Sequence, residues 1–374
     1  VMCDGVTLTG DPLKENVDYT FDKDTHLLTI KTAGEYTLSG TAKDQNFRVK
    51  VGEKVSRIQT TLTIDNLTIN TYIKEDEEHA PQGYSPLDFS DAGATTLILV
   101  GKNHLTARAQ NPAVFAPKVE KDGDLVDQLT IGGEGSLVAT GGYAWPGIGN
   151  TGSAKILIQS GNITAVGGGH AAGIGGSWGF WFDSIVIKGG HVVATGGADA
   201  QNDIGCGRDP GGEGHGSKRD HTILIDGGVV EAERIYGQGD KEDRTALIHT
   251  SGTLIQSENR TYMSDATLDE KVTISSGKTM KIGKDATVTI GKNGGLEIED
   301  GATLYVDGTV QGNITGNGKI YYKLNYDLDG GAGKVINGFS GYGASLYVPE
   351  AQLEEAKDLL ASRPVEDEET EEHA

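Results

Sequence analysis

A glycine-rich motif that recurs through the middle of the chain limits most strongly how this sequence can fold. The motif reads GGYAWPGIG at residues 141–149, GGHAAGIGG at 168–176 and GADAQNDIGCG at 197–207. Each copy is followed by a short run in which apolar and polar residues alternate, which is the period of a β-strand and not of a helix. Internal repeats of this size, built from strands and turns, predict a solenoid.

Apolar pairs within the alternating runs mark the successive strands. They are Leu62/Ile64, Leu97/Leu99, Leu129/Ile131, Ile156/Ile158, Ile185/Ile187 and Ile223/Ile225, and their first members lie 35, 32, 27, 29 and 38 residues apart. Such unequal intervals are natural for stacked coils that carry loops of different lengths. After residue 270 the period falls to eight residues, so three strand-and-turn units would make one coil of 24 residues.

These patterns predict an all-β chain whose residues 55–320 form a right-handed parallel β-helix, a pectate-lyase-like solenoid. Residues 1–54 are expected to form an N-terminal β cap, because an uncovered first coil would expose unpaired strand edges. Residues 321–374 are expected to form a C-terminal extension with a short helix and an acidic tail. Each coil should stack on the next at about 4.8 Å.

Composition narrows the possible partners. The net charge of -22 argues against nucleic acid or an anionic membrane as a partner, since both would be repelled. No apolar run approaches the roughly 20 residues of a membrane span. Only Cys3 and Cys206 are present, without metal-binding or redox spacing. The chain opens without a basic-then-apolar leader. We predict a secreted or cell-surface bacterial protein that is monomeric, does not insert into membranes and needs no cofactor or metal.

One carboxylate breaks the glycine-rich repeat. The column that holds Gly147 and Gly173 holds Asp203 in the third copy. The segment from residue 201 to residue 221 also concentrates further acids and bases, namely Asp209, Glu213, His215, Asp220 and His221. Aspartate in a glycine-rich turn often caps backbone N–H groups, and Asp209 begins an ordinary Asp-Pro-Gly-Gly turn. Loss of a repeat glycine in a candidate cleft nevertheless favours a functional role for Asp203.

Aromatic residues gather just before this segment. The chain has three tryptophans, Trp145, Trp178 and Trp181, and by the repeat register they lie one or two coils before Asp203. Their flat faces could stack on sugar rings. For Trp181, closing the loop over the coil is an equally good interpretation.

Four polar residues complete the predicted substrate-binding set. His170 and Asp183 lie near the tryptophans and could hydrogen-bond sugar hydroxyls. Arg208 could hold an acidic substituent and His215 belongs to the same loop, although a solvated surface charge explains Arg208 better and a loop position explains His215 better.

The repeats also carry a family resemblance. The GGxxAGIGG turn followed by an Ile-x-Ile-x-Gly-Gly strand resembles the glycine-rich right-handed β-helix of large secreted proteins of gut Firmicutes. Within that group, the architecture of residues 50–320 is similar to that of the β-helical lacto-N-biosidase family of glycoside hydrolases. The resemblance implies a pair of aspartates, one acid/base and one nucleophile, acting on a β-linked host oligosaccharide. Here Asp203 and Asp209 are the residues that could take those places.

Three functions follow from these observations. The first is a secreted glycoside hydrolase that cleaves host or dietary oligosaccharides, retaining or inverting according to the separation of the two carboxyl groups. The second is a non-catalytic carbohydrate-binding or adhesive surface module, in which the tryptophans bind glycan and the acids cap turns. The third is a polysaccharide lyase, which would use Ca²⁺-ligating acids and an Arg or Lys base. The long insertion with its acids and bases at residues 201–221 occurs in one coil only, which favours the hydrolase, because functional residues concentrate in loops on a rigid scaffold.

Overall fold

The structure is a computed structural model that describes residues 1–11, 13–53, 57–71, 84–107, 110–117, 128–208, 221–236, 245–326 and 344–361. The described part of the chain is all-β, with 53% of those residues in strands and 3% in helices. It divides into two compact units, Val1–Ser257 (unit 1) and Glu258–Ala374 (unit 2). The predicted boundaries after residues 54 and 320 stay predictions.

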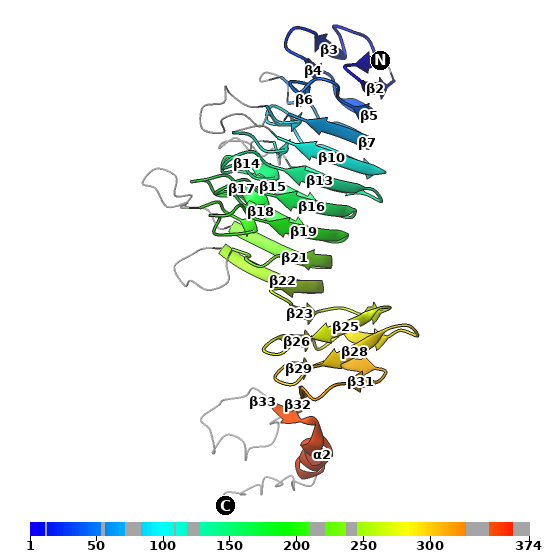
Figure 1. The fold of residues 1–374 in the computed structure, drawn as a ribbon, viewed down its shortest axis with the longest axis vertical. Helices are drawn as coiled ribbons and strands as arrows, with labels where there is room; N and C mark the ends of the chain where they lie inside the picture. The colour runs from blue at the N-terminus through cyan, green and yellow to red at the C-terminus, as the bar shows by residue number, and fades with distance from the viewer. Residues whose placement is uncertain are drawn as a thin grey trace, which may run out of the picture. The chain divides into compact units, whose positions relative to one another are not determined.

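Two long parallel ladders make up most of unit 1 (Figure 1). The first joins, in order, β5 (Gly34–Thr41), β7 (Thr60–Asn70), β9 (Thr95–Val100), β12 (Leu129–Gly133), β15 (Lys155–Ile158), β18 (Ser184–Ile187), β21 (His221–Glu231) and β22 (Thr245–Gln256). The second runs from β7 through β10 (Lys102–Thr106), β13 (Ser136–Thr140), β16 (Asn162–Val166) and β19 (His191–Thr195) to β21. Strands β7 and β21 therefore belong to both ladders.

This sharing closes the sheet and overturns the predicted fold class. The pairings run around a closed ring of ten parallel strands, β7, β9, β12, β15, β18, β21, β19, β16, β13 and β10, so the sheet is a parallel barrel accompanied by separate sheets. The predicted right-handed parallel β-helix solenoid is wrong. That prediction rested on repeats built from strands and turns. In β21 the pairing instead continues through register shifts at Asp226, where Gly227 and Gly228 have φ of 146° and 71°. Such a bulge bends a strand without removing it from its ladder.

The register of the first ladder follows the apolar pairs except at one step. Ile156 pairs with Ile185, and Ile185 pairs with Ile223, so like residues stack. Between β9 and β12, however, Leu97 pairs with Ile131 and not with Leu129. The shift is two residues, so the same side chains still face inward, because side chains alternate between the faces with period two.

A second sheet of eight strands lies in the same unit. It contains β3 (Tyr19–Asp22), β4 (Leu27–Ile30), β6 (Arg48–Val51), β8 (Leu87–Asp88), β11 (Val114–Phe115), β14 (Ile148–Asn150), β17 (Ile174–Gly176) and β20 (Ile204–Gly205). All of its pairings are parallel except the β3–β4 hairpin. At the N-terminus, β1 (Met2–Cys3) pairs antiparallel with β2 (Val6–Gly10), which pairs antiparallel with β5.

Unit 2 is built from three smaller groups of strands. They are β23 (Asn259–Tyr262), β26 (Thr279–Ile282), β29 (Thr303–Val306), β32 (Lys319–Tyr326) and β33 (Ala344–Pro349); β24 (Ala266–Leu268), β27 (Thr287–Ile290) and β30 (Thr309–Gln311); and β25 (Lys271–Ile274), β28 (Gly295–Ile298) and β31 (Ile314–Thr315). Met280 pairs with Leu304, 24 residues further on, the spacing expected from the eight-residue repeat. A 3-10 turn, η1 (Glu350–Gln352), leads into the helix α2 (Leu353–Ala361).

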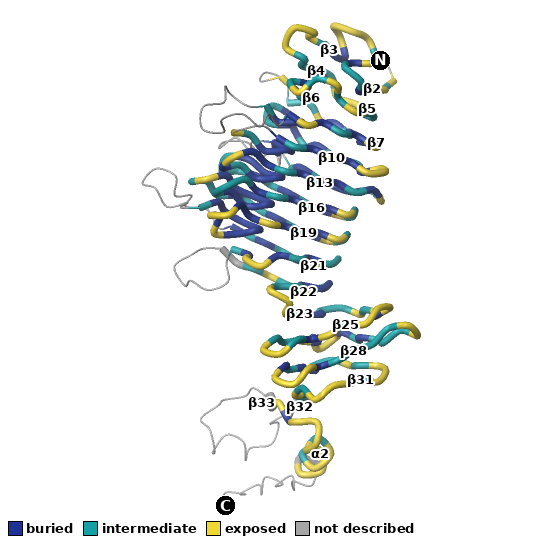
Figure 2. The backbone as a smooth tube through the Cα atoms, viewed as in Figure 1, coloured by how far each residue is buried: buried dark blue, intermediate teal, exposed yellow. Residues whose placement is uncertain are grey.

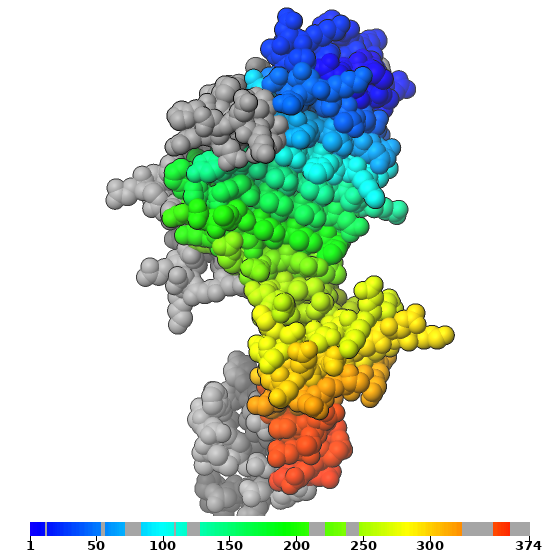
Figure 3. Space-filling model, in the orientation of Figure 1, coloured from blue at the N-terminus to red at the C-terminus, as the bar shows by residue number. Residues whose placement is uncertain are grey.

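Each unit has its own hydrophobic core. In unit 1 the core residues run from Cys3 to Leu254, and in unit 2 they run from Tyr262 to Val306. Buried residues lie along the strands and exposed ones gather at the turns (Figure 2). Within unit 1, residues that neighbour one another in space come from successive repeats, as the order of the colours shows (Figure 3). The turns of successive repeats are therefore brought together, and the candidate site is formed there.

Candidate functional site

Successive glycine-rich turns of unit 1 touch through their backbones. A Cβ atom built on Gly168 would lie 2.0 Å from the carbonyl oxygen of Gly142, and one on Gly197 would lie 2.4 Å from that of Gly168. Real Cβ atoms do not approach a carbonyl so closely, so only glycine fits at these points. This contact stacks the three turns and places the side chains that they carry in one column.

Asp203 takes over a hydrogen bond that backbone atoms make in the other two repeats. The Gly141 and Gly167 amides each donate to a strand-end carbonyl of the following repeat, Val166 and Thr195, both at 2.8 Å. In the third repeat the Gly196 amide donates instead to Oδ1 of Asp203, at 2.7 Å. The departure from glycine thus supplies an acceptor where the ladder no longer offers a carbonyl.

The rest of the Asp203 carboxylate is also engaged. Its Oδ2 accepts from the backbone amides of Glu233 and Arg234, both at 2.8 Å, and its Oδ1 lies 3.2 Å from Nη2 of Arg234. The residue is only 3% exposed. Nη1 of the same arginine donates to the carbonyl of Ala200. A carboxylate with four donors is well placed as a structural cap, and nucleophilic attack would require several of these bonds to break.

Asp209 and His215 lie outside the described residues, so the predicted aspartate pair stays a prediction. Asp183 is described, and its Oδ2 lies 3.4 Å from Nζ of Lys155 while its backbone amide donates to the carbonyl of Ala154. Its side chain is 16% exposed. Asp183 therefore joins the starts of β15 and β18 through an ion pair.

Three rings from neighbouring turns form a surface cluster, which we call the aromatic surface: Tyr143, His170 and Trp178. The ring centroids of Tyr143 and His170 lie 5.6 Å apart, and those of His170 and Trp178 lie 5.4 Å apart. Trp178 is 54% exposed and Tyr143 is 42% exposed. Large aromatic side chains that stay this open on a rigid backbone can offer their faces to a ligand.

The histidine at the centre of the aromatic surface is held between two polar groups. Its Nε2 lies 3.2 Å from the hydroxyl oxygen of Tyr143. Its Nδ1 is buried without a hydrogen bond, and the nearest carboxylate oxygen, Oδ2 of Asp199, is 3.6 Å away. The side chain of Asp199 is 61% exposed. The carboxylate is thus open to solvent beside the rings.

The backbone of Arg208 ties the parts of this surface together. Its amide donates to the carbonyl of His170 at 2.8 Å, and its carbonyl accepts from Gly179 at 2.9 Å. The amide of Trp178 in turn donates to the carbonyl of Ala144 at 3.0 Å. Of the predicted binding residues, the structure therefore brings His170, Trp178 and Arg208 together.

The other two tryptophans belong to separate ring groups. Trp181 stacks on His221 with 4.9 Å between centroids and 7° between planes, and its edge meets Tyr236 at 5.4 Å. This packing at the start of β21 matches the interpretation in which Trp181 closes its loop. Trp145 packs against Phe115, with 5.7 Å between the ring centroids.

Sequence reasoning missed Tyr143 and Asp199 as members of the surface. Each lies in a glycine-rich turn that stacks against the turn of His170, so the stacking of the repeats carried the signal. They were missed because the prediction rested on the glycine position that Asp203 replaces.

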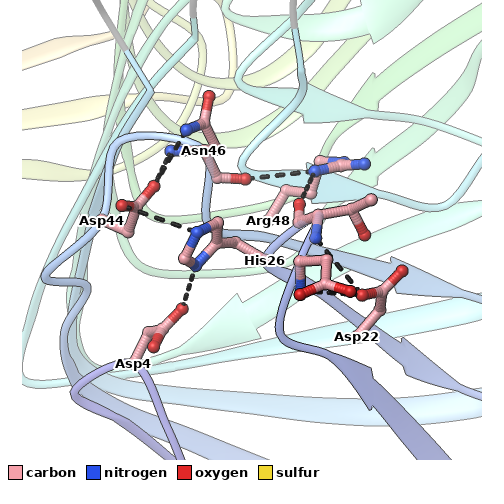
Figure 4. A network of polar contacts seen from close by, with 8 residues as sticks. Asp4, Asp22, His26, Asp44, Asn46 and Arg48 are labelled. Atoms are coloured by element: carbon pink, nitrogen blue, oxygen red, sulfur yellow. Dashed lines mark hydrogen bonds and ion pairs between the residues drawn. The ribbon is translucent and has the colours of Figure 1, made fainter.

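A second polar network, which the sequence did not point to, lies among the N-terminal turns (Figure 4). Nδ1 of His26 lies 2.5 Å from Oδ2 of Asp4, and its Nε2 lies 3.7 Å from Oδ2 of Asp44. The hydrogen bond to Asp4, aided by the charge of Asp44, raises the pKa of His26. Nearby, Arg48 donates to the carbonyls of Thr25 and Asn46. The network joins three turns, which favours a structural role.

Among the residues that the structure describes, no cluster of His, Cys, Asp and Glu is arranged to hold a metal ion. Cys3 and Cys206 are both buried, and they are not joined by a disulfide. None of the described helices has the length and apolar character of a membrane span. No family model, no curated protein and no solved structure matches the chain.

Proposed function

We propose that the chain is a non-catalytic carbohydrate-binding module that holds a glycan on the aromatic surface of unit 1. The observation that carries the proposal is the exposure of Trp178 and Tyr143 around a histidine that is fixed by hydrogen bonding. One face of a pyranose ring is lined with C–H groups and its rim carries hydroxyls. Aromatic residues with a polar tip suit both features, and the exposed carboxylate of Asp199 can accept hydrogen bonds from hydroxyl groups.

Binding is favoured over hydrolysis by the state of the acids nearest the rings. Glycosidic cleavage needs two carboxyl groups that flank the bond and are free to exchange protons or to attack. Asp203 is buried and has donors on both oxygens, and Asp183 is paired with Lys155. Asp199 is open but is the one described carboxylate beside the aromatic surface. The proposal fits the predicted secreted or cell-surface location, where glycans are available.

The test is binding of the full chain to an array of mucin, milk and plant oligosaccharides, followed by calorimetric titration with any glycan retained. Trp178→Ala and Tyr143→Ala should each weaken binding by about tenfold, since ring stacking and the area that it buries contribute roughly 1 kcal/mol or more. Val17→Ala is the matched control, because Val17 is 57% exposed in the N-terminal segment. Unchanged affinity in both ring variants would refute the site.

The same oligosaccharides distinguish binding from hydrolysis. Incubation should leave them intact, as followed by released reducing sugar with and without EDTA. Turnover that is lost in both Asp203→Asn and Asp209→Asn would instead establish the aspartate pair as catalytic. Metal-dependent formation of unsaturated ends would indicate a lyase.

A further inference from the structure

Unit 2 carries a separate set of aromatic rings, one exposed and two partly buried, on the outer face of one of its ladders. Met280 of β26 and Leu304 of β29 are fully buried and face inward. Successive side chains of a strand point to opposite faces, so the residues on either side of each of these two face outward. The outward residues of β26, β29 and β32 are Thr279, Lys281, Thr303, Tyr305, Lys319, Tyr321 and Lys323. This face combines aromatic rings, hydroxyls and ammonium groups.

Three tyrosines form the centre of this surface, which we call the tyrosine face: Tyr305, Tyr321 and Tyr347. Tyr305 and Tyr321 are register partners whose rings stack with centroids 5.6 Å apart and an interplanar angle of 18°. Tyr347, from β33, meets the Tyr305 ring edge-on at 5.2 Å. Stacked and edge-on pairs support one another, so contacts within the tyrosine face hold its rings in place.

A buried carboxylate fixes the third ring. The hydroxyl of Tyr347 donates to Oδ1 of Asp307 at 2.5 Å, and Nζ of Lys323 lies 3.3 Å from its Oδ2. The side chain of Asp307 is only 7% exposed. Burial, together with this carboxylate, raises the pKa of Tyr347 to about 12. The phenol therefore stays neutral, and the Asp307 carboxylate is already paired.

The remaining charges of the face are positive. Lys281 is the register partner of Tyr305 on the side opposite Tyr321, and Lys319 is the partner of Thr303. Both lysines are exposed. Among the described residues, neither ammonium group lies within 4.0 Å of a carboxylate. A cationic patch beside stacked rings stands out in a chain whose net charge is -22.

We propose that the tyrosine face binds an oligosaccharide that carries an acidic sugar of the uronate class. The tyrosine rings would cover the C–H face of one pyranose, and Lys281 would pair with the carboxylate of that sugar or its neighbour. A polyphosphate such as a nucleic acid fits less well, because its tight binding needs many ion pairs and the acidic chain repels it. The site is independent of the aromatic surface, since it lies in the other unit and takes a charged ligand.

The experiment is calorimetric titration of the full chain with an oligogalacturonate and with a neutral galactose oligomer of the same length. The acidic oligomer should bind more tightly, and its affinity should fall as salt is added. Lys281→Gln should weaken its binding by about two- to fivefold, the range for an exposed ion pair, while Lys281→Arg restores it. Tyr305→Ala should weaken it by about tenfold.

Two controls keep the result specific. Lys292→Gln removes an equally exposed charge from a turn outside this face and should change nothing. All three tryptophans lie in unit 1. Binding at the tyrosine face should therefore leave tryptophan fluorescence unchanged and should persist in Trp178→Ala, whereas binding at the aromatic surface should not.

Several outcomes would overturn the proposal. They are equal affinity for the acidic and neutral oligomers, an unchanged affinity in Lys281→Gln, or tighter binding of an oligonucleotide of the same charge. If Tyr305→Ala does not fold, Lys281→Gln and Lys281→Arg still test the proposal. The Lys281 side chain is exposed, so replacing it does not disturb the core.

Discussion

The side chain of Asp203 accepts the hydrogen bond that a backbone carbonyl accepts in the two preceding repeats. Four donors, three of them backbone amides, converge on its two oxygens. Only an acceptor with two oxygens can satisfy all of them. The break in the glycine pattern marked a residue with a structural role of its own. Sequence alone could not reveal that the following repeat supplies no carbonyl at this point.

The Asp203→Asn variant should therefore lose stability. Its NH₂ group would face N–H donors, leaving a buried amide unsatisfied at a cost of about 1–3 kcal/mol. Urea unfolding followed by tryptophan fluorescence measures this loss in unit 1. Asp199→Asn, at an exposed position, should change the unfolding free energy little. Equal midpoints for Asp203→Asn and the parent protein would contradict the capping role.

His26 should make the N-terminal turns sensitive to pH. Its pKa is raised by the hydrogen bond to Asp4, so the bond stabilises the folded chain fully below the unfolded pKa of about 6.5. The stabilisation is then lost as the pH rises through the raised folded pKa. Melting temperatures recorded from pH 5 to pH 9 should show this loss in the parent protein, and Asp4→Asn should flatten the curve. A curve that keeps its slope in Asp4→Asn would exclude the pair as its source.

At the scale of the strands, alternation predicted most of the elements and many of their partners. The stacking of Ile156 on Ile185 and of Ile185 on Ile223 agrees with the alternating pattern, because a shift of one residue would turn every aliphatic side chain outward. The closure of the ring through β7 and β21 could not be foreseen. Closure depends on whether the strand pairing continues across a bulge. The polar and glycine residues at that bulge are equally typical of a turn, so the sequence does not distinguish the two.

The inward and outward positions of one strand should differ sharply in their contribution to stability. Ile158 is fully buried between Ile131 and Ile187, so Ile158→Ala should cost about 2–5 kcal/mol through lost burial and a residual cavity. Leu157 lies on the other face of the same strand and is only partly buried. Chemical denaturation should show a clearly smaller loss for Leu157→Ala. Similar losses for both variants would mean that β15 does not pack as described.

At the scale of the whole molecule, the chain has two hydrophobic cores and two kinds of aromatic surface. The tryptophan-containing surface belongs to unit 1 and the tyrosine face belongs to unit 2. The alternating pattern predicted a chain built from strands. It could not predict the aromatic surface or the tyrosine face, since both arise from residues that approach one another only when the strands pair.

The register of the first ladder also bears on how such a chain can change during evolution. From β12 to β21 the same aliphatic positions stack, although the chain between them runs for 27, 29 and 38 residues. The scaffold thus accepts an insertion of roughly ten residues without a slip in pairing, consistent with the slow growth of loop-closure entropy with length. A lineage could therefore acquire a new recognition loop by insertion, leaving every core contact as it was.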